Sequence, residues 1–283
     1  MLIVLGAVVG LLTVRLLVVC GRDVLEAPAL QRRNFRDRPL PTAAGLLVVL
    51  AVLIVEAGRD TLGAFGLGDE PGRNIARPLV LFACLGFGLL GLIDDLIGTG
   101  GDRGFRGHLR AITQGRATTG AIKIFGGAAV ALVLASNVSF VSGRRLLTDA
   151  VLIALAANLA NLLDRAPGRA IKFGLVAWVP IAVVAGTDAV GIAIAPVIGA
   201  FCGLLGDDLR EHLMLGDTGA NVLGAVLGLA VVLDVGRGAR NGVLIGLILL
   251  TIAAEMVSFS AVIERVPILR RFDMLGRSGS GDT

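Results

Sequence analysis

The stretch PLVLFACLGFGLLGLIDDLI, Pro78 to Ile97, decides how this sequence folds. It runs for 20 residues and carries no charge before Asp94 and Asp95, near its end. A helix needs about 20 mostly apolar residues to cross the hydrocarbon core of a bilayer. We therefore predict a membrane-spanning helix that ends in two adjacent carboxylates.

Comparable apolar runs recur along all 283 residues. Hydrophobic residues make up 55% of the chain and charged residues 17%, and the mean hydropathy is +0.85, whereas a soluble domain carries about 25% charged residues. The fold class that follows is all-α, a polytopic transmembrane helical bundle of about nine spans. We expect residues 1–263 to form a single transmembrane catalytic domain and residues 264–283 a cytoplasmic tail. The expected spans are 1–20, 42–57, 78–97, 120–140, 147–164, 171–186, 189–206, 214–235 and 241–263.

Basic residues gather on alternate connecting segments. Of the 26 Lys and Arg residues, 18 lie in the segments 21–41, 98–123, 165–172, 207–213 and 264–283. Loops rich in Lys and Arg stay in the cytoplasm, so we predict the N-terminus outside and the C-terminus inside. This topology explains the basic balance without a nucleic-acid partner, and membrane lipid is the expected surrounding.

Acidic residues supply an independent check on that topology, because they end or begin predicted spans on the same side. A carboxylate at membrane depth is costly and is a functional candidate by default. For two of them, Asp207 and Asp208, the reading as ordinary interfacial residues stays open. The six positions are Asp94, Asp95, Asp164, Asp207, Asp208 and Asp217.

Two of these aspartates lie in polar motifs. In NLANLLD, the three-residue spacing puts Asn158, Asn161 and Asp164 on one broad helix face. Such a face suits a polar headgroup or a hydrated metal, and hydrogen bonding between helices is the alternative for Asn158. In MLGDTGAN, Asp217 opens a helix, and the free N–H groups of a helix start bind phosphate well.

A glycine-rich basic loop, Gly101 to Lys123, leads into another predicted helix. A loop of this kind before a helix start forms an anion site, and Arg106, His108 and Lys123 are its candidate substrate-binding residues. It lacks the GxxxxGK[ST] pattern of a phosphate-binding Walker loop. The alternative is a loop that only sets topology. Carboxylates, amides and basic groups on one side together suit Mg²⁺ and a diphosphate.

The order of the motifs PTAAG, LIDD, TTGAIK, NLANLLD and MLGDTGAN, from Pro41 to Asn221, resembles the polyprenyl-phosphate N-acetylhexosamine-1-phosphate transferases. The resemblance implies Mg²⁺-dependent transfer of a sugar-1-phosphate from a UDP-sugar to a polyprenyl phosphate, undecaprenyl or decaprenyl, with release of UMP. It also implies a multi-pass protein of the prokaryotic cytoplasmic membrane that serves peptidoglycan or other cell-wall synthesis. A homodimer is left open.

The resemblance also assigns roles to single residues. Asp94 and Asp95 match the paired catalytic aspartates, of which the first deprotonates or positions the lipid phosphate. Asp217 matches a catalytic aspartate that binds Mg²⁺, and we take Asp95 as the second metal ligand. Lys123 matches a lysine that contacts phosphate. Asn161, with Asp164 and Asn158, matches the polar face beside the metal.

This chain departs from the family pattern at two places. Arg165-Ala166-Pro167-Gly168 replaces Gly-Leu-Asp-Gly, so an acidic nucleotide contact is missing. Val266 to Asp273, VPILRRFD, stands where the family has a histidine-rich loop, and a tenth span is absent. We predict that Arg169 binds the donor through its diphosphate, because a guanidinium suits phosphate. The alternative is that Arg165 and Arg169 anchor the loop at lipid headgroups.

Two other functions remain as rivals. A catalytically divergent paralogue could bind lipid phosphate, or act as a scaffold, without turnover; the missing nucleotide contact favours this reading. A transporter or flippase is opposed by the clustering of charge on one side. No inverted pair of broken helices, the usual sign of a secondary transporter, is visible in the sequence.

Overall fold

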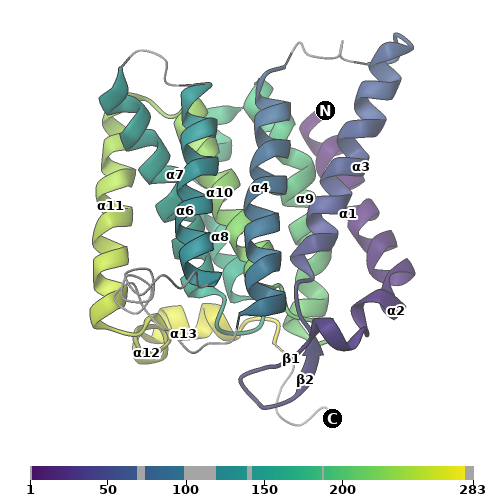
Figure 1. Ribbon diagram of the computed structural model, residues 1–283, viewed down its shortest axis with the longest axis vertical. Coiled ribbons are helices and arrows are strands. Elements are labelled where there is room, and N and C mark those ends of the chain that lie inside the picture. The colour runs from purple at the N-terminus through teal and green to yellow at the C-terminus, as the bar shows by residue number, and fades with distance from the viewer. Residues whose placement is uncertain (1, 69–73, 99–118, 139–141, 187, 278–283) are drawn as a thin grey trace.

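The computed structural model describes residues 2–68, 74–98, 119–138, 142–186 and 188–277. It is a bundle of roughly parallel long helices with a few short elements at one end (Figure 1). The elements are α1 (Leu2–Cys20), α2 (Arg22–Leu25), η1 (Pro28–Leu30), β1 (Gln31–Arg33), β2 (Pro39–Pro41), α3 (Gly45–Ala64), α4 (Ala76–Ile97), α6 (Thr119–Ser136), α7 (Gly143–Leu163), α8 (Arg169–Ala185), α9 (Ala189–Leu209), α10 (Gly216–Asp234), α11 (Arg237–Met256), α12 (Phe259–Arg265) and α13 (Pro267–Met274).

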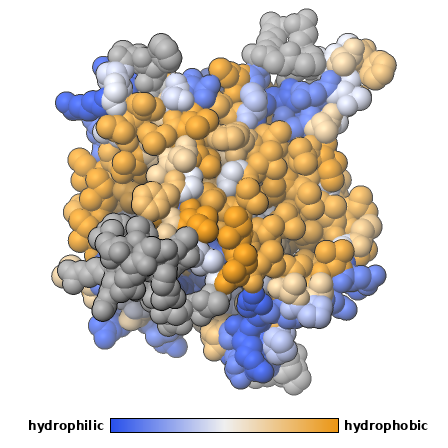
Figure 2. Space-filling view, in the orientation of Figure 1, coloured by the Kyte–Doolittle hydropathy of each residue, from blue (hydrophilic) through white to orange (hydrophobic). Residues whose placement is uncertain are grey.

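The prediction of an all-α membrane bundle is confirmed. Each of the nine expected spans contains a long helix, and seven helices among the described residues are long and apolar enough to cross a membrane. The other two are α8, which has only 17 residues, and α3, which contains Glu56, Arg59 and Asp60. The count of nine spans and the direction of the termini stay predictions. Figure 2 shows hydrophobic side chains across the middle of one face and hydrophilic ones at its two ends.

The core of the bundle is α10, which is buried along most of its length and packs chiefly against α4 and α7. Its early turns lie very close to α4. A Cβ atom added to Gly91 of α4 would lie 2.4 Å from the carbonyl oxygen of Asp217. Only glycine permits such a close approach of one helix backbone to another. This packing brings the end of α4 to the beginning of α10.

One end of the bundle gathers the acidic motifs. In Figure 1, α4, α7 and α9 end at the lower side, and α6, α8 and α10 begin there. This is the grouping predicted from the charge pattern. The opposite end has its own ion pairs, in which Arg77 of α4 bonds to Glu56 and Asp60 of α3, at 2.6 and 2.8 Å. The helix α3 therefore continues to Ala64, beyond the predicted end at 57, because its charged residues find partners.

The structure differs from the sequence-based expectation at two further places. The last span was expected to run to residue 263, but α11 ends at Met256 and α12 begins at Phe259. The expected tail, 264–283, contains the whole of the helix α13, and the expected domain boundary falls inside α12. Two three-residue strands, β1 and β2, pair antiparallel within the segment 21–41, where no strand was expected. Neither strand has the length or alternation that signals a strand in a sequence.

Candidate active site

The site is built around the beginning of α10, which receives a carboxylate from α4. The two oxygens of Asp95 accept hydrogen bonds from the backbone N–H groups of Asp217 (3.0 Å) and Thr218 (2.9 Å), and the Thr218 hydroxyl donates a third at 2.6 Å. The first N–H groups of a helix have no partner within the helix, and negative charge is favourable there. Asp95 therefore acts as an N-cap supplied by another helix.

Two more carboxylates contact the same stretch of backbone. The backbone N–H of Gly216 faces the carboxylate of Asp164, the residue that ends α7. The N–H of Leu215 faces Asp208, near the end of α9, and Asp208 also accepts a hydrogen bond from Gly168 at 3.1 Å. Three helix ends thus contribute one carboxylate each to four consecutive N–H groups, Leu215 to Thr218. These carboxylates hold the motif in place.

The remaining two aspartates face a lysine instead of backbone. Lys123, in the first turns of α6, forms an ion pair with Asp217, and its Nζ lies 3.6 Å from Oδ2 of Asp94. The carboxylates of Asp94 and Asp217 also lie within hydrogen-bonding reach of each other. All three side chains are partly exposed, so a ligand can reach them. Asp94, Asp217 and Lys123 are therefore the part of the site that is open to chemistry.

Two buried amides lie on the helices beside Asp217. The side chain of Asn161 faces Asp217, yet its buried Nδ2 completes no hydrogen bond among the described residues. Asn221, one turn further along α10, is 3% exposed, and its Nδ2 likewise has no partner there. Asn158 is exposed and lies outside these contacts. The structure thus places Asn161 and Asp164 of the predicted polar face beside Asp217, and Asn158 does not join them.

Carboxylates outnumber cations in this cluster. We name the five aspartates and Lys123 the acidic cluster. The pKa of Asp164 is raised well above its usual value, first by burial and then by the charges of Asp208, Asp217 and Asp95. Like charges so close together destabilise the ionised forms unless a cation intervenes. The members are Asp94, Asp95, Asp164, Asp208, Asp217 and Lys123.

Mg²⁺ fits part of this donor set. No group of three or more acidic, His or Cys side chains is arranged to hold a metal ion within the described ranges. Mg²⁺, however, is usually bound by one or two carboxylates together with substrate phosphates. Asp94 and Asp217 offer two such carboxylates around one ammonium group. The oxygens of Asp95 are engaged by α10, so Asp94 is better placed than Asp95 as the partner of Asp217.

The structure gives Arg169 partners within the protein, an arrangement that opposes the prediction that it binds the donor. Arg169 begins α8, is 3% exposed and makes a two-pronged ion pair with Asp273 of α13, at 2.8 and 2.9 Å. Its third nitrogen donates to the hydroxyl of Ser260 at 2.8 Å. Each of its three side-chain nitrogens has an acceptor within the protein. The anchoring alternative is altered for Arg169 too, because its partners lie in α12 and α13. Arg106 and His108 lie outside the described residues.

Sequence reasoning missed some polar contacts of this end. Thr218 gave no signal beyond its place in the motif, and Asp208 was left undecided between two readings. Its neighbour Asp207 lies apart from the cluster and pairs with Arg15 and with His212, whose Nδ1 is 3.2 Å away. The carboxylate Asp273 carried no signal at all, since it lies in a short segment expected to be a tail.

The fold and this cluster define a multi-pass membrane protein with an acidic site at one end of its bundle. No protein-family model matches the sequence. The chain is similar to the phospho-N-acetylmuramoyl-pentapeptide-transferase of Oceanobacillus iheyensis, 28% identical over 271 residues, which cover 84% of this chain and 76% of the relative. It is equally similar to the enzyme of that name from Desulforamulus reducens, 28% identical over 263 residues, 84% of this chain and 75% of the relative.

These similarities confirm the resemblance drawn from the motifs, because both relatives bear the name of one phosphosugar transferase and are matched over most of their length. The chain is a divergent relative of these transferases. With seven long apolar helices among the described residues, it is a multi-pass protein of the bacterial cytoplasmic membrane, as predicted.

Proposed function

We propose that this protein transfers a sugar-1-phosphate, of an N-acetylhexosamine, from a UDP-sugar to a polyprenyl phosphate at the cytoplasmic face of the membrane. The products are a polyprenyl diphosphate sugar, for a cell-envelope polymer, and UMP. The observation that carries the proposal is the meeting of Asp94, Asp217 and Lys123 at one end of the bundle. The similarity of this chain to two phospho-N-acetylmuramoyl-pentapeptide-transferases supports the same reaction class.

In this reaction an oxygen of the lipid phosphate attacks the β-phosphorus of the donor, and the bond from that phosphorus to the oxygen of UMP breaks. Asp94 accepts the proton of the lipid phosphate or orients its oxygen. Its carboxylate is partly exposed and lies 3.6 Å from Nζ of Lys123, and unlike Asp217 it does not lie at the start of a helix. Lys123 exchanges one carboxylate for a phosphate oxygen and holds it. Direct attack needs only a cleft that aligns both substrates, without a covalent enzyme intermediate.

Asp217, with Asp94, would hold Mg²⁺ in this proposal. When bound there, Mg²⁺ supplies positive charge to the diphosphate oxygens while the leaving bond breaks. Asn161, whose amide faces Asp217 and whose Nδ2 has no hydrogen-bond partner in the described part of the chain, would donate to an oxygen of the UDP-sugar. Asp95, Asp164 and Asp208 keep the backbone of α10 in register with these groups.

The test is release of UMP from candidate donors. Purified full-length protein is given UDP-N-acetylglucosamine and related UDP-sugars, with undecaprenyl phosphate and Mg²⁺, beside a transferase of known activity as the positive control. We expect UMP release with at least one donor, and none when Mg²⁺ is chelated. Absence of UMP release with every donor, while the control enzyme is active, would refute the proposal.

A second function keeps one observation in its favour. The turn between α7 and α8 lacks the family's acidic nucleotide contact and is covered by α13 instead. A protein that binds lipid phosphate without turnover would need no such contact. Measured binding of polyprenyl phosphate with no affinity for any UDP-sugar would favour this function over the transferase.

A further inference from the structure

The segment after α11 returns to the end of the bundle that holds the acidic cluster. We name residues 259–277, which include α12 and α13, the C-terminal arm. In Figure 1 its two short helices lie across the lower end, where α8 begins. From residue 264 onward the arm was expected to be a tail, yet its contacts with the bundle include a nearly buried carboxylate, Asp273, which is 4% exposed.

Asp273 is bound by two guanidinium groups. Arg169 meets both of its oxygens, and Arg277 donates to Oδ1 at 2.6 Å. The charges of these partners lower the pKa of Asp273, although burial alone would raise it. A buried carboxylate with a two-pronged guanidinium partner is a strong and geometrically specific contact. Arg169 belongs to the first turn of α8, so this pair ties the arm to the beginning of α8.

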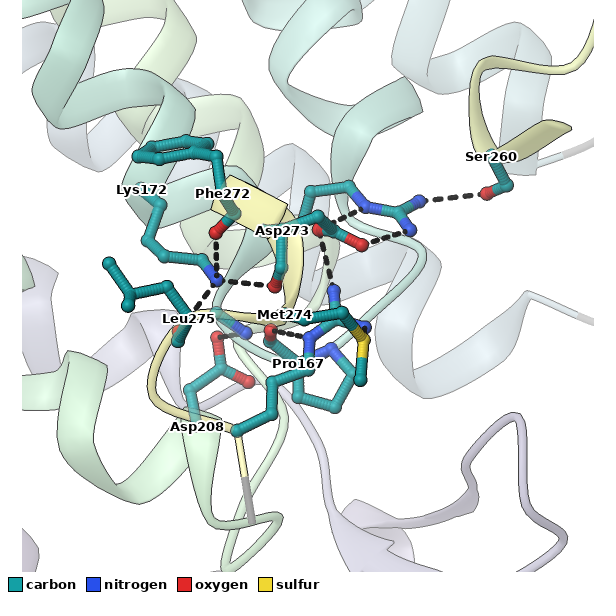
Figure 3. A network of polar contacts seen from close by, with 11 residues as sticks. Pro167, Lys172, Asp208, Ser260, Phe272, Asp273, Met274 and Leu275 are labelled. Carbon is teal, nitrogen blue, oxygen red and sulfur yellow. Dashed lines mark hydrogen bonds and ion pairs between the residues drawn. The ribbon is translucent and has the colours of Figure 1, made fainter. Parts of the chain in front are cut away.

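Lys172, one turn further along α8, binds the end of α13. Its Nζ donates to the carbonyl oxygens of Phe272 (3.1 Å), Asp273 (2.5 Å) and Leu275 (3.0 Å), as Figure 3 shows. The last carbonyls of a helix have no partner within it, and a cation there is favourable. Three donors are used for three acceptors, which leaves the ammonium group no capacity for a substrate. We name Asp273 with Arg169, Lys172 and Arg277 the C-terminal lock.

The lock also reaches the turn between α7 and α8. Arg277 donates from Nε to the carbonyl oxygen of Pro167 at 3.1 Å. The next residue, Gly168, has a φ of +68°, and a Cβ there would lie 2.4 Å from Cδ2 of Leu209. Only glycine can meet both conditions. Its N–H donates to Asp208, whose carboxylate faces the N–H of Leu215 just before α10.

These contacts form one continuous path from the arm to the site. The arm holds the turn 164–168, and the turn meets the start of α10 twice, through Asp164 facing Gly216 and through Asp208 between Gly168 and Leu215. The two segments in which this chain departs from the family pattern, 165–168 and 266–273, are held together by bonds that involve their flanking residues. Arg169 bonds to Asp273, and Arg277 bonds to Pro167.

We propose that the C-terminal arm is a positioning element of the site, in which Asp273 fixes the α7–α8 turn and thereby the start of α10 that carries Asp217. This inference rests on the proposed transferase function for its catalytic consequence. Asp273 touches neither substrate in this scheme and acts only through Arg169, Arg277 and the turn. The competing explanation is a purely structural anchor, whose loss would loosen the arm without reaching α10.

The test compares two variants of the full-length protein in lipid nanodiscs. Asp273→Asn removes the charge of the lock and keeps its shape. Asp149→Asn is the matched control, because Asp149 is 2% exposed and pairs with the buried Arg240 at 2.9 Å, at the other end of α7. Hydrogen exchange of backbone amides is measured by mass spectrometry over 164–172 and 215–218. Exchange reports opening of each segment separately.

We expect Asp273→Asn to speed exchange in both windows by about tenfold or more, equivalent to about 1.4 kcal/mol of local opening. The control should leave both windows unchanged. Asp273→Glu, which restores the charge, should recover part of the protection. Fast exchange confined to the arm and the turn 164–172, with 215–218 unchanged, would overturn the proposal in favour of a plain anchor.

Kinetics supply the second readout. If the wild-type protein releases UMP, Asp273→Asn should lower kcat with little change in KM for the donor, because substrate contacts are intact and only their alignment is lost. An inactive wild-type protein would refute the proposed function, while the exchange data still decide the role of the arm. Should Asp273→Asn fail to fold, Lys172→Met takes its place, because it removes the contacts of the ammonium group with the end of α13. It must then speed exchange in the same two windows.

Discussion

The acidic cluster and the C-terminal lock lie at the same end of the bundle, and they differ in how their charged side chains are paired. In the lock every nitrogen of Lys172 and Arg169 has an acceptor within the protein, and Asp273 has two guanidinium partners. In the acidic cluster Asp94 and Asp217 share one lysine, and Asp95, Asp164 and Asp208 face backbone N–H groups. A buried charge without its partners is costly. The charges of the lock are paired within the protein, whereas Asp94 and Asp217 have one cation between them, which is where the proposed function adds a ligand.

A second contrast lies inside the acidic cluster, between neighbours in the sequence. Asp95 gives both oxygens to the backbone of α10, and Asp94 gives its carboxylate to Lys123. Their chemistry is identical, so their surroundings alone separate the positioning role of Asp95 from the catalytic role proposed for Asp94.

The largest effect is expected for Asp217→Asn, which tests whether the cluster needs its negative charge. An amide keeps the shape of the side chain but loses the charge that holds a hard cation. Removing one such electrostatic group lowers kcat by about 10²–10³-fold, and the remaining activity should depend less on Mg²⁺. The measurement is UMP release at several Mg²⁺ concentrations, with thermal unfolding to show that the fold survives. Full activity at low Mg²⁺ would contradict the assignment.

Arg169→Ala tests the pairing of charges in the lock, and its expected effect is on stability. The change leaves Asp273 with a missing partner in a buried position, and breaking a buried pair in this way costs about 3–5 kcal/mol. Unfolding in denaturant measures the loss. Because Arg169 makes no contact with substrate in this scheme, the ratio of UDP-sugar to uridine affinity should be unchanged. A stable variant with a selective loss of UDP-sugar affinity would restore the original prediction that Arg169 binds the diphosphate.

The contrast between Asp94 and Asp95 is tested by two alanine variants. Asp95→Ala leaves N–H groups of α10 without an acceptor, at a cost of about 1–3 kcal/mol in the free energy of unfolding. Asp94→Ala removes no backbone partner among the described residues, so its loss of stability should be clearly smaller while UMP release is abolished. Equal losses of stability in the two variants would show that their roles are not separate.

The smallest effect is expected from pH, through the lock. The pKa of Asp273 is lower in the folded protein than in the unfolded chain, so its contribution to stability is fully present above the unfolded value, about 3.9. That contribution is lost as the pH falls through the folded pKa. The stability difference between wild type and Asp273→Asn should therefore be constant from pH 7 to about 5 and shrink below about pH 4. A difference that grows on acidification would contradict the ion pair.

The sequence by itself determined that this protein is a helical membrane bundle, and it grouped the acidic motifs at one end. It could do so because apolar length and the distribution of Arg are local properties of each segment. The motifs LIDD, NLANLLD and MLGDTGAN also pointed to Asp94, Asp164 and Asp217 as members of one site. The structure brings all three to the start of α10.

Only the tertiary structure decided what each of these charges does. Neighbouring residues on a helix point about 100° apart, so packing against α10 settles which of Asp94 and Asp95 meets backbone and which meets Lys123. Arg169 was predicted to contact phosphate because its partner could not be recognised from the sequence. That partner, Asp273, is 104 residues away. A cation beside a glycine-rich turn has the same appearance whether it awaits a ligand or already holds a distant carboxylate. The pattern fixes where a charge can lie, and the free energy of burial selects its partner from the whole chain.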